Sequence, residues 1–207
     1  ISVLDYLRNN NDSFDTEEYV KSKLFGIDIN NSIARISKMK LLLETNTQTN
    51  IFCTNSLNDF DELGLNINKP KNGFDIVLTN PPFGTSGKIT NKSLLSKFDL
   101  GYKWIKNNEK FIKLNNVKSS QVAEILFIER CIDLLRAGGR IGIVVPNGHL
   151  ENPSLEYLRQ YIRNRTKILA IINLPQEAFI PYGTGIKTSL LFLEKKSHTK
   201  RSLSRHK

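Results

Sequence analysis

Hydrophobic and polar positions along the chain form blocks that predict strands and helices in turn. Short apolar runs bounded by polar residues predict strands at 23–29, 49–54, 76–80, 140–145, 167–173 and 186–193. Apolar residues at helical spacing predict helices at 1–9, 31–43, 120–137 and 153–164. The last two strands, 167–173 and 186–193, are joined without a helix. The pattern therefore predicts an α/β fold with a mostly parallel sheet and one antiparallel strand near the C-terminus.

The helix expected at 31–43 shows how these elements are bounded. Asn30 or Asn31 is a suitable N-cap, and Ile36, Met39 and Leu43 follow at spacings of three and four residues. In the same way, the run Ile76 to Leu78 predicts a buried strand, because apolar residues stand side by side in it. That strand stops at a double proline.

The stretch Asn80-Pro81-Pro82-Phe83 carries the most specific candidate chemistry. The prolines fix the backbone, and Pro81 keeps Asn80 out of the helical region. An amide oxygen, a free carbonyl and an aromatic ring are thereby held at the carboxyl end of a strand, where open α/β sheets bind ligands. Two acceptors and a ring suit methylation of a planar exocyclic amine on a base turned out of a duplex. A plain Asn-Pro turn is the alternative.

This string resembles the catalytic motif of S-adenosylmethionine-dependent DNA methyltransferases that act on amino groups, in the form typical of adenine-specific enzymes. The rest of the chain, to about residue 195, is most similar to the modification subunit of type I restriction-modification systems. The resemblance implies a Rossmann-like methyltransferase fold with helices on both faces of the sheet. Since the glycine-rich cofactor loop of the family has no counterpart before Gly183, we expect a fragment whose first strand is missing.

The resemblance also implies the residues that hold the cofactor. Asp28 ends the second strand of the family pattern and is expected to bind the ribose hydroxyls of S-adenosylmethionine. Ile29, Asn55, Ser56 and Leu57 are expected to line the same site together with Asn80, although the family usually has an acid where Asn55 stands. Two alternatives stay open: Asp28 could simply lead the next helix, and Asn55 could simply make an Asn-Ser turn.

Positive charge is concentrated in two places. The chain carries a net charge of +10, and residues 84–118 hold eight lysines against Asp99 and Glu109. This stretch shows no clear periodicity, so we expect a long basic loop. Its lysines and aromatic rings are expected to contact DNA. The candidates for contact with the DNA backbone are Lys88, Lys92, Lys97 and Lys103. A solvated lysine-rich loop is the alternative. The basic tail at 196–207 suits a polyanion partner; a lead into a further region and plain disorder are the alternatives.

A second aromatic group precedes the final strand. Phe179 and Tyr182 lie in the segment that follows the strand at 167–173, near the expected catalytic loop. Either ring could hold a flipped base against Phe83, and a turn with a packed aromatic ring is an equal alternative. In the family this region helps to form the base pocket.

Composition excludes several other classes of protein. No apolar run reaches the length of a membrane span, so we expect a cytoplasmic protein. Cys53 and Cys131 lack metal-type spacing and are expected to be buried, reduced thiols, and the histidines form no pattern, so no metal is expected.

The sequence thus predicts a methyltransferase catalytic domain at 1–195 that transfers a methyl group from S-adenosylmethionine to the 6-amino group of adenine in double-stranded DNA. By resemblance, the expected partners are a separate DNA-specificity subunit and a restriction subunit. The alternatives are methylation of cytosine N4, of an RNA guanine or of a protein glutamine, and a DNA- or partner-binding remnant without activity.

Overall fold

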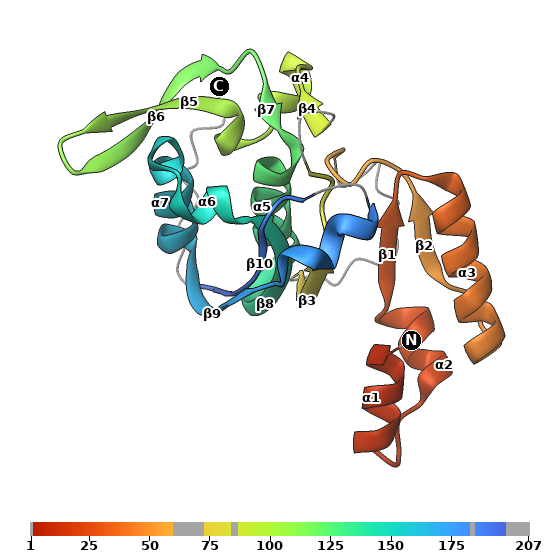
Figure 1. The fold of residues 1–207 in the computed structure, drawn as a ribbon. Helices are drawn as coiled ribbons and strands as arrows, with labels where there is room; N and C mark the ends of the chain where they lie inside the picture. Colours follow the sequence, from red (N-terminus) through yellow and green to blue (C-terminus); the bar gives the residue numbers. More distant parts are fainter. Residues whose placement is uncertain (1, 60–72, 84–86, 183–184, 198–207) are drawn as a thin grey trace. The chain divides into compact units, whose positions relative to one another are not determined.

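The computed structural model describes residues 2–59, 73–83, 87–182 and 185–197 (Figure 1). The chain divides into two compact units, 1–69 and 70–207. The elements of the first unit are α1 (Ser2–Asn10), α2 (Thr16–Ser22), β1 (Phe25–Asp28), α3 (Asn31–Thr45) and β2 (Asn50–Cys53). β1 and β2 pair in parallel, with Asp28 aligned to Cys53. These bounds confirm the strands and helices expected for this part of the sequence and add α2.

Helix caps explain where α2 and α3 begin. The side chain of Asn30 accepts hydrogen bonds from the backbone N–H groups of Ser32 (2.9 Å) and Ile33 (3.2 Å), so Asn30 is the N-cap of α3. Asp15 accepts from the N–H of Glu18 (3.0 Å) in the same way and starts α2. The Asp-x-x-Glu spacing is the sequence signal that would have revealed this helix.

The apolar face predicted for α3 is wrong. Ile36, Met39 and Leu43 are 63%, 59% and 80% exposed. The helix instead buries Ala34, Leu41 and Thr45. The core of the first unit consists of Leu4, Val20, Ala34, Leu41 and Ile51.

The second unit contains a four-stranded sheet, its helices and an inserted segment. The sheet strands are β3 (Phe74–Thr79), β8 (Leu135–Pro146), β9 (Thr166–Asn173) and β10 (Thr188–Lys195). The helices beside it are α5 (Ala123–Leu134), α6 (Asn147–Glu151), η3 (Pro153–Leu155), α7 (Glu156–Arg165) and η4 (Gln176–Tyr182). The inserted segment comprises β4 (Lys88–Ile89), α4 (Lys92–Leu95), η2 (Asp99–Gly101), β5 (Tyr102–Asn107), β6 (Lys110–Val117) and β7 (Gln121–Val122).

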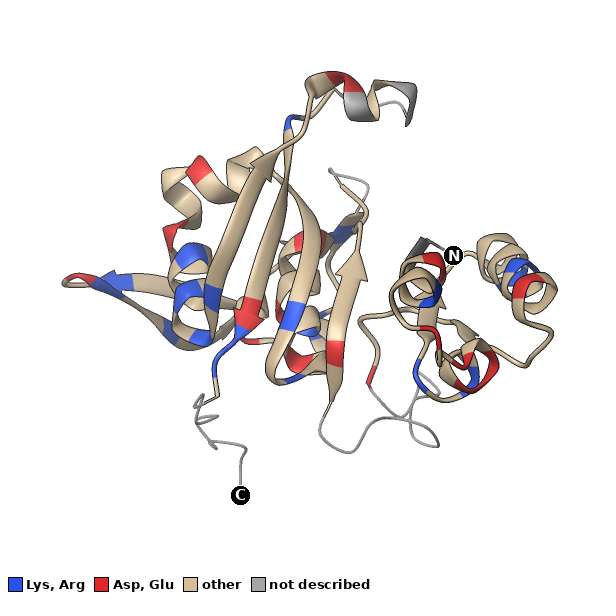
Figure 2. Ribbon diagram, turned by 90° about the horizontal axis from the view of Figure 1, so that it is seen from below, with Lys and Arg blue, Asp and Glu red and all other residues tan. Residues whose placement is uncertain are grey.

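The sheet has the order β3-β8-β10-β9. β3 pairs with β8 in parallel, whereas β10 runs antiparallel to both of its neighbours, as expected from the missing helix between the last two strands. α5 contacts β8 and β3, and α7 contacts β9 (Figures 1 and 2). The apolar sheet residues of the core are Leu135, Ile141, Ile143, Val144, Val145, Leu191 and Leu193.

The expectation that β3 is a buried strand is wrong. Ile76 and Leu78 are each 63% exposed. Within the described residues β3 pairs only with β8, so it lies at the edge of this sheet. A run of apolar residues predicts burial on both faces, but the pairing and the layers that decide exposure are not local properties.

The expectation of an irregular loop at 84–118 is also wrong. β4 pairs with β7, and between them β5 and β6 form an antiparallel hairpin. Of the aromatic residues expected to stack on bases, Phe98 is 2% exposed, and the half-buried Trp104 stacks on Tyr157 at 6.1 Å and 26°. Short strands that pair only with each other leave little periodicity in the sequence, which explains the error.

Three further expectations concern exposure and composition. Cys131 is buried as expected, but Cys53 is exposed, because it lies at the end of β2. In the described ranges no group of three or more His, Cys, Asp or Glu side chains is arranged to hold a metal ion. None of the helices described here is long and apolar enough to cross a membrane.

Candidate active site

The Asn-Pro-Pro-Phe stretch lies directly after β3. Asn80 is exposed, Pro81 is buried, and Phe83 is half-buried. The buried Pro81 ring fixes the turn, while the amide of Asn80 stays accessible at the carboxyl end of the strand. This is the arrangement that the sequence predicts for an amide acceptor presented to a ligand.

Phe83 contacts Phe179, which lies 96 positions later in the sequence. Their ring centroids are 6.0 Å apart, and the ring planes are at 89° to each other. This edge-to-face contact does not form a parallel slot in which a base would be sandwiched between both rings. It offers the face of one ring and the edge of the other. Tyr182 ends η4, and its side chain lies outside the described part.

The first residue of α5 lies close to the Asn-Pro-Pro-Phe stretch. A Cβ atom placed on Gly87 would lie 3.5 Å from the Ala123 Cβ and 3.7 Å from the carbonyl oxygen of Pro82. Pro82, Gly87 and Ala123 are thus close neighbours. The Asn-Pro-Pro-Phe stretch and the insertion that begins with β4 therefore both lie at the start of α5.

A polar network joins the strand ends around the base of η4. The hydroxyl of Ser189 lies 2.8 Å from the side-chain oxygens of both Asn147 and Asn173. Because a hydroxyl has one hydrogen to donate, one of the two amides must present its NH₂ group instead. The N–H of Asn147 also donates to the carbonyl oxygen of Lys187 (2.9 Å). The network ties β8, β9 and β10 together and fixes both ends of the segment that carries Phe179. These residues were not predicted from the sequence. The signal that could have revealed them is an asparagine directly after β8 and another at the end of β9.

Two buried ionisable residues of α5 and α6 stand near this end of the sheet. Burial lowers the pKa of His149 to about 4, so its ring is neutral at neutral pH. Its Nε2 lies 4.0 Å from Oε1 of Glu124, beyond hydrogen-bonding distance. His149 and Glu124 are thus part of the packed core, and we assign neither of them a role in proton transfer.

Apart from Asn80, which belongs to the second unit, the expected cofactor residues gather at one edge of the first unit. Asp28 ends β1, and its Oδ1 accepts a hydrogen bond from the N–H of Asn30 (2.7 Å), which leaves the second oxygen for another donor. Asn55 follows β2, and its Oδ1 accepts from the N–H of Leu57 (3.0 Å) in a turn. Ile29 is 71% exposed, whereas Leu57 is 2% exposed and can offer only its backbone. Parallel pairing of β1 and β2 brings Asp28 and Asn55 to the same edge.

The four lysines expected at the DNA backbone all have exposed side chains. Lys88 lies on β4, Lys92 on α4, Lys97 just after it and Lys103 on β5. They thus extend along the insertion from the base near Pro82 to the hairpin. Blue segments mark the basic residues along this part in Figure 2.

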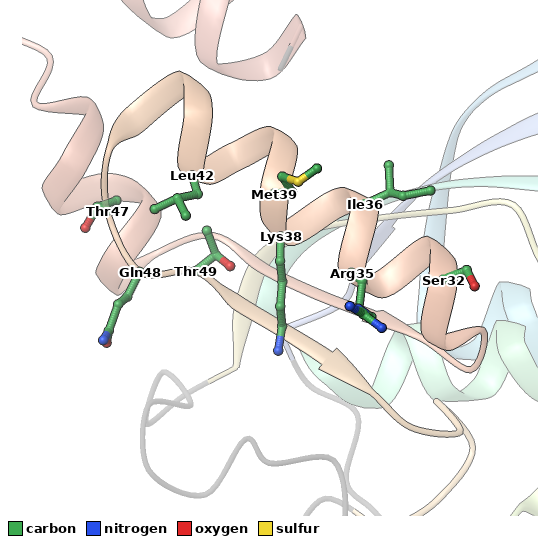
Figure 3. Close-up of a pocket in the computed structure, with 9 residues that line it drawn as sticks. All are labelled: Ser32, Arg35, Ile36, Lys38, Met39, Leu42, Thr47, Gln48 and Thr49. Carbon is green, nitrogen blue, oxygen red and sulfur yellow. The ribbon is translucent and has the colours of Figure 1, made fainter.

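A hollow of about 840 Å³ lies beside α3 in the first unit (Figure 3). It contains none of the expected catalytic or cofactor residues. The side chains that line it come from α3 and from the segment before β2: Ser32, Arg35, Ile36, Lys38, Met39, Leu42, Thr47, Gln48 and Thr49. It follows the exposed apolar side of the helix and holds no cluster of groups suited to catalysis.

The mixed sheet and its motif at the end of β3 define an α/β methyltransferase fold. A putative class I S-adenosylmethionine-dependent methyltransferase from Listeria monocytogenes superposes with a TM-score of 0.62 over 89% of this chain and 47% of its own, at 16% sequence identity. The fold class predicted from the sequence is confirmed.

The chain belongs to the N-6 DNA methylase family, whose model matches residues 1–204. The type I restriction enzyme EcoEI methylase subunit of Escherichia coli is 29% identical over 141 residues, which are 65% of this chain and 24% of that protein. A modification subunit of a putative type I restriction enzyme from Vibrio vulnificus YJ016 superposes with a TM-score of 0.69 at 24% identity, over 93% of this chain and 37% of that one. The chain thus spans about a quarter of the curated relative.

Proposed function

We propose that the protein transfers a methyl group from S-adenosylmethionine to the 6-amino group of adenine in DNA, as the modification subunit of a restriction-modification system. The observation that carries this proposal is the exposed amide of Asn80 at the end of β3, beside Phe83, in a chain of the N-6 DNA methylase family. The similarity to type I methylase subunits supports the same reaction.

The geometry suggests how the chain's own residues would act. An exocyclic amine shares its lone pair with the ring and is a poor nucleophile. The Asn80 side-chain oxygen and the Pro81 carbonyl oxygen would accept its two hydrogens, which favours a more tetrahedral nitrogen with an available lone pair. Phe83 would stack on one face of the flipped base, and the edge of Phe179 would close one side of the site. The sulfonium of the cofactor supplies an activated methyl group, so the leaving group needs no acid.

The first unit offers groups that fit the cofactor. The free oxygen of Asp28 can accept a ribose hydroxyl, and the exposed Ile29 can pack on an adenine ring. Ser56 and the backbone of Leu57 complete this edge. Since the Asn55 oxygen already accepts from Leu57, its contribution to adenine recognition is weaker than that of an acid at this place would be.

The proposed partners follow from the relatives. Double-stranded DNA would be the substrate, and a separate specificity subunit would select the sequence, with a restriction subunit in the complete system. The reaction would take place in the cytoplasm, where the DNA is. The exposed lysines Lys88, Lys92, Lys97 and Lys103 would contact phosphates.

The Asn80→Ala variant tests the proposal. Loss of the amide acceptor is expected to lower turnover by about 10²-fold or more, by analogy with the loss of one oxyanion-hole group. The measurement is transfer of a labelled methyl group to duplex DNA by the full-length protein with its partner subunits, followed by identification of the methylated base. Asn80→Asp keeps an acceptor and is expected to retain more activity than Asn80→Ala.

The control is Asn116→Ala, which removes an exposed amide on β6 and should leave turnover unchanged. Near-normal turnover of Asn80→Ala would contradict the assigned role. Methylcytosine, or label recovered in RNA or protein and not in DNA, would replace the proposed substrate with one of the alternatives.

A further inference from the structure

The β5–β6 hairpin has two faces of different character. Its inner face is bound to α7 by aromatic and hydrogen-bonding contacts. Trp104 stacks on Tyr157 and meets Tyr161 edge-on at 6.2 Å and 86°. The side chain of Gln160 donates to the carbonyl oxygen of Phe111 and accepts from its N–H, each at 2.8 Å. The hairpin is therefore a fixed arm of the second unit (Figure 1).

The lysines of the inner side are already engaged. Lys106 pairs with Glu156 at 3.3 Å, and Lys113 pairs with Asp99 at 2.7 Å. Arg165 reaches the other oxygen of Asp99 at 2.8 Å. The acids beside the arm are thus neutralised by cations of its inner side and of α7, which leaves the outer face without a compensating acid beside it.

The outer face carries an unusual set of side chains. Ile105 and Ile112 are cross-strand partners and are 46% and 42% exposed. Asn107 and Lys110 form the next pair toward the turn, and Lys103 lies on the same side of β5; all three are exposed. Within the described part, neither Lys103 nor Lys110 forms an ion pair, so two cations flank an apolar pair on one side of the ribbon.

We propose that this outer face, formed by Lys103, Ile105, Asn107, Lys110 and Ile112, lies in a groove of the DNA duplex on which the protein acts. The inference rests on the proposed function. A two-stranded ribbon fits the major groove, which is about 12 Å wide. The two lysines reach phosphates on either side, and the isoleucines pack against the groove floor, where thymine methyl groups offer apolar contacts.

Charge decides between DNA and a protein partner. Lysine is depleted at protein interfaces, where its strongly hydrated ammonium group is costly to bury, whereas it is favoured at phosphates. Two of the five outer side chains are lysines and none is acidic; the nearest acid of the arm, Glu109, lies in the turn. The position of the arm agrees with this, since the insertion begins at Gly87, next to the carbonyl of Pro82.

The test separates the two kinds of contact. Binding of the full-length protein to a fluorescently labelled DNA duplex is followed by anisotropy over a series of KCl concentrations. The double variant Lys103→Gln/Lys110→Gln should bind about tenfold more weakly, with a salt slope less steep by about two, because two phosphate contacts are lost. Ile105→Ser/Ile112→Ser should bind about fivefold more weakly with the salt slope of the wild type, since only apolar contact is lost.

The matched control is Arg163→Gln/Lys167→Gln, which removes two exposed cations from α7 and β9 and should bind like the wild type. A wild-type salt slope in the lysine variant, or wild-type affinity in the isoleucine variant, would overturn the inference and leave the proposed function intact. A wild-type protein that methylates no DNA and binds no duplex would overturn the proposed function, and with it this inference.

Discussion

Glu129 shows how a single buried carboxylate holds the inserted segment. It lies on α5, is 5% exposed, and accepts hydrogen bonds from the N–H groups of Asp99 (2.7 Å) and Leu100 (2.8 Å). Burial raises the pKa of Glu129 from 4.5 to about 7, although these two N–H groups act in the opposite direction. The folded protein therefore binds a proton at this site more tightly than the unfolded chain does.

This pKa shift predicts how stability depends on pH. The stabilisation from the proton on Glu129 is complete below pH 4.5 and is lost as the pH rises through about 7. Glu129→Gln removes that dependence. The free energy of unfolding of the variant relative to the wild type should therefore rise across this window, by up to about 3 kcal/mol. Chemical denaturation at several pH values measures it, with the exposed Glu151→Gln variant as control. A constant difference between Glu129→Gln and wild type would contradict the assignment.

At the residue scale, the sequence predicts features that depend on the local backbone conformation, which residues adjacent in the chain determine. Asn80 and Phe83 could be singled out because the prolines between them fix the local backbone. The contact between Phe83 and Phe179 and the network around Ser189 could not, since both depend on which strands become neighbours. The sequence placed Phe179 near the loop, but the perpendicular arrangement of the rings is a property of the packing.

At the element scale, the hairpin is the part of the molecule that differs most from the expectation. Residues 84–118 contain no long periodic run, so they suggested an irregular loop. The order comes from contacts with a helix that follows much later: Trp104 packs on two tyrosines of α7, and the backbone of Phe111 pairs with Gln160. The strand at 23–29 was predicted correctly, whereas the strand at 140–145 was predicted only in part, because β8 begins at Leu135, within the helix expected at 120–137.

The link between the hairpin and α7 can be weakened at one side chain. Gln160→Ala removes two hydrogen bonds from the backbone of Phe111, which is partly buried. We expect the hairpin to lose about 1–3 kcal/mol of local stability, while the sheet keeps its own. Amide hydrogen exchange of residues 102–117 should accelerate correspondingly. The control Asn164→Ala alters an exposed residue of the same helix, and equal exchange in both variants would show that Gln160 does not hold the hairpin.

At the scale of the whole molecule, the two units have opposite net charges. The unit at 1–69 has seven Lys and Arg against ten Asp and Glu, a net −3, whereas the unit at 70–207 has 23 against ten, a net +13. The candidate catalytic loop and the hairpin both belong to the basic unit. Binding of a polyanion is thus expected to depend on that unit.

This charge distribution predicts strong salt dependence of DNA binding. Between 50 and 200 mM KCl, the affinity of the full-length protein for duplex DNA should fall by about 10²-fold or more, because several phosphate contacts are exchanged for counterions. The same titration with a sequence lacking the recognition site is the control and should show a similar slope. An affinity that stays constant over this range would contradict a phosphate-dominated interface.

The exposed side of α3 adds a consequence for how the protein behaves in different electrolytes. Ile36, Met39 and Leu43 form an exposed apolar surface on this helix. Sulfate and phosphate ions are excluded from protein surfaces and therefore strengthen the association of such apolar surfaces. A high concentration of a chloride salt would therefore dissociate the protein from nucleic acid without causing the protein to self-associate. A sulfate salt at equal ionic strength would also dissociate the protein from nucleic acid, but it would then promote self-association of the protein.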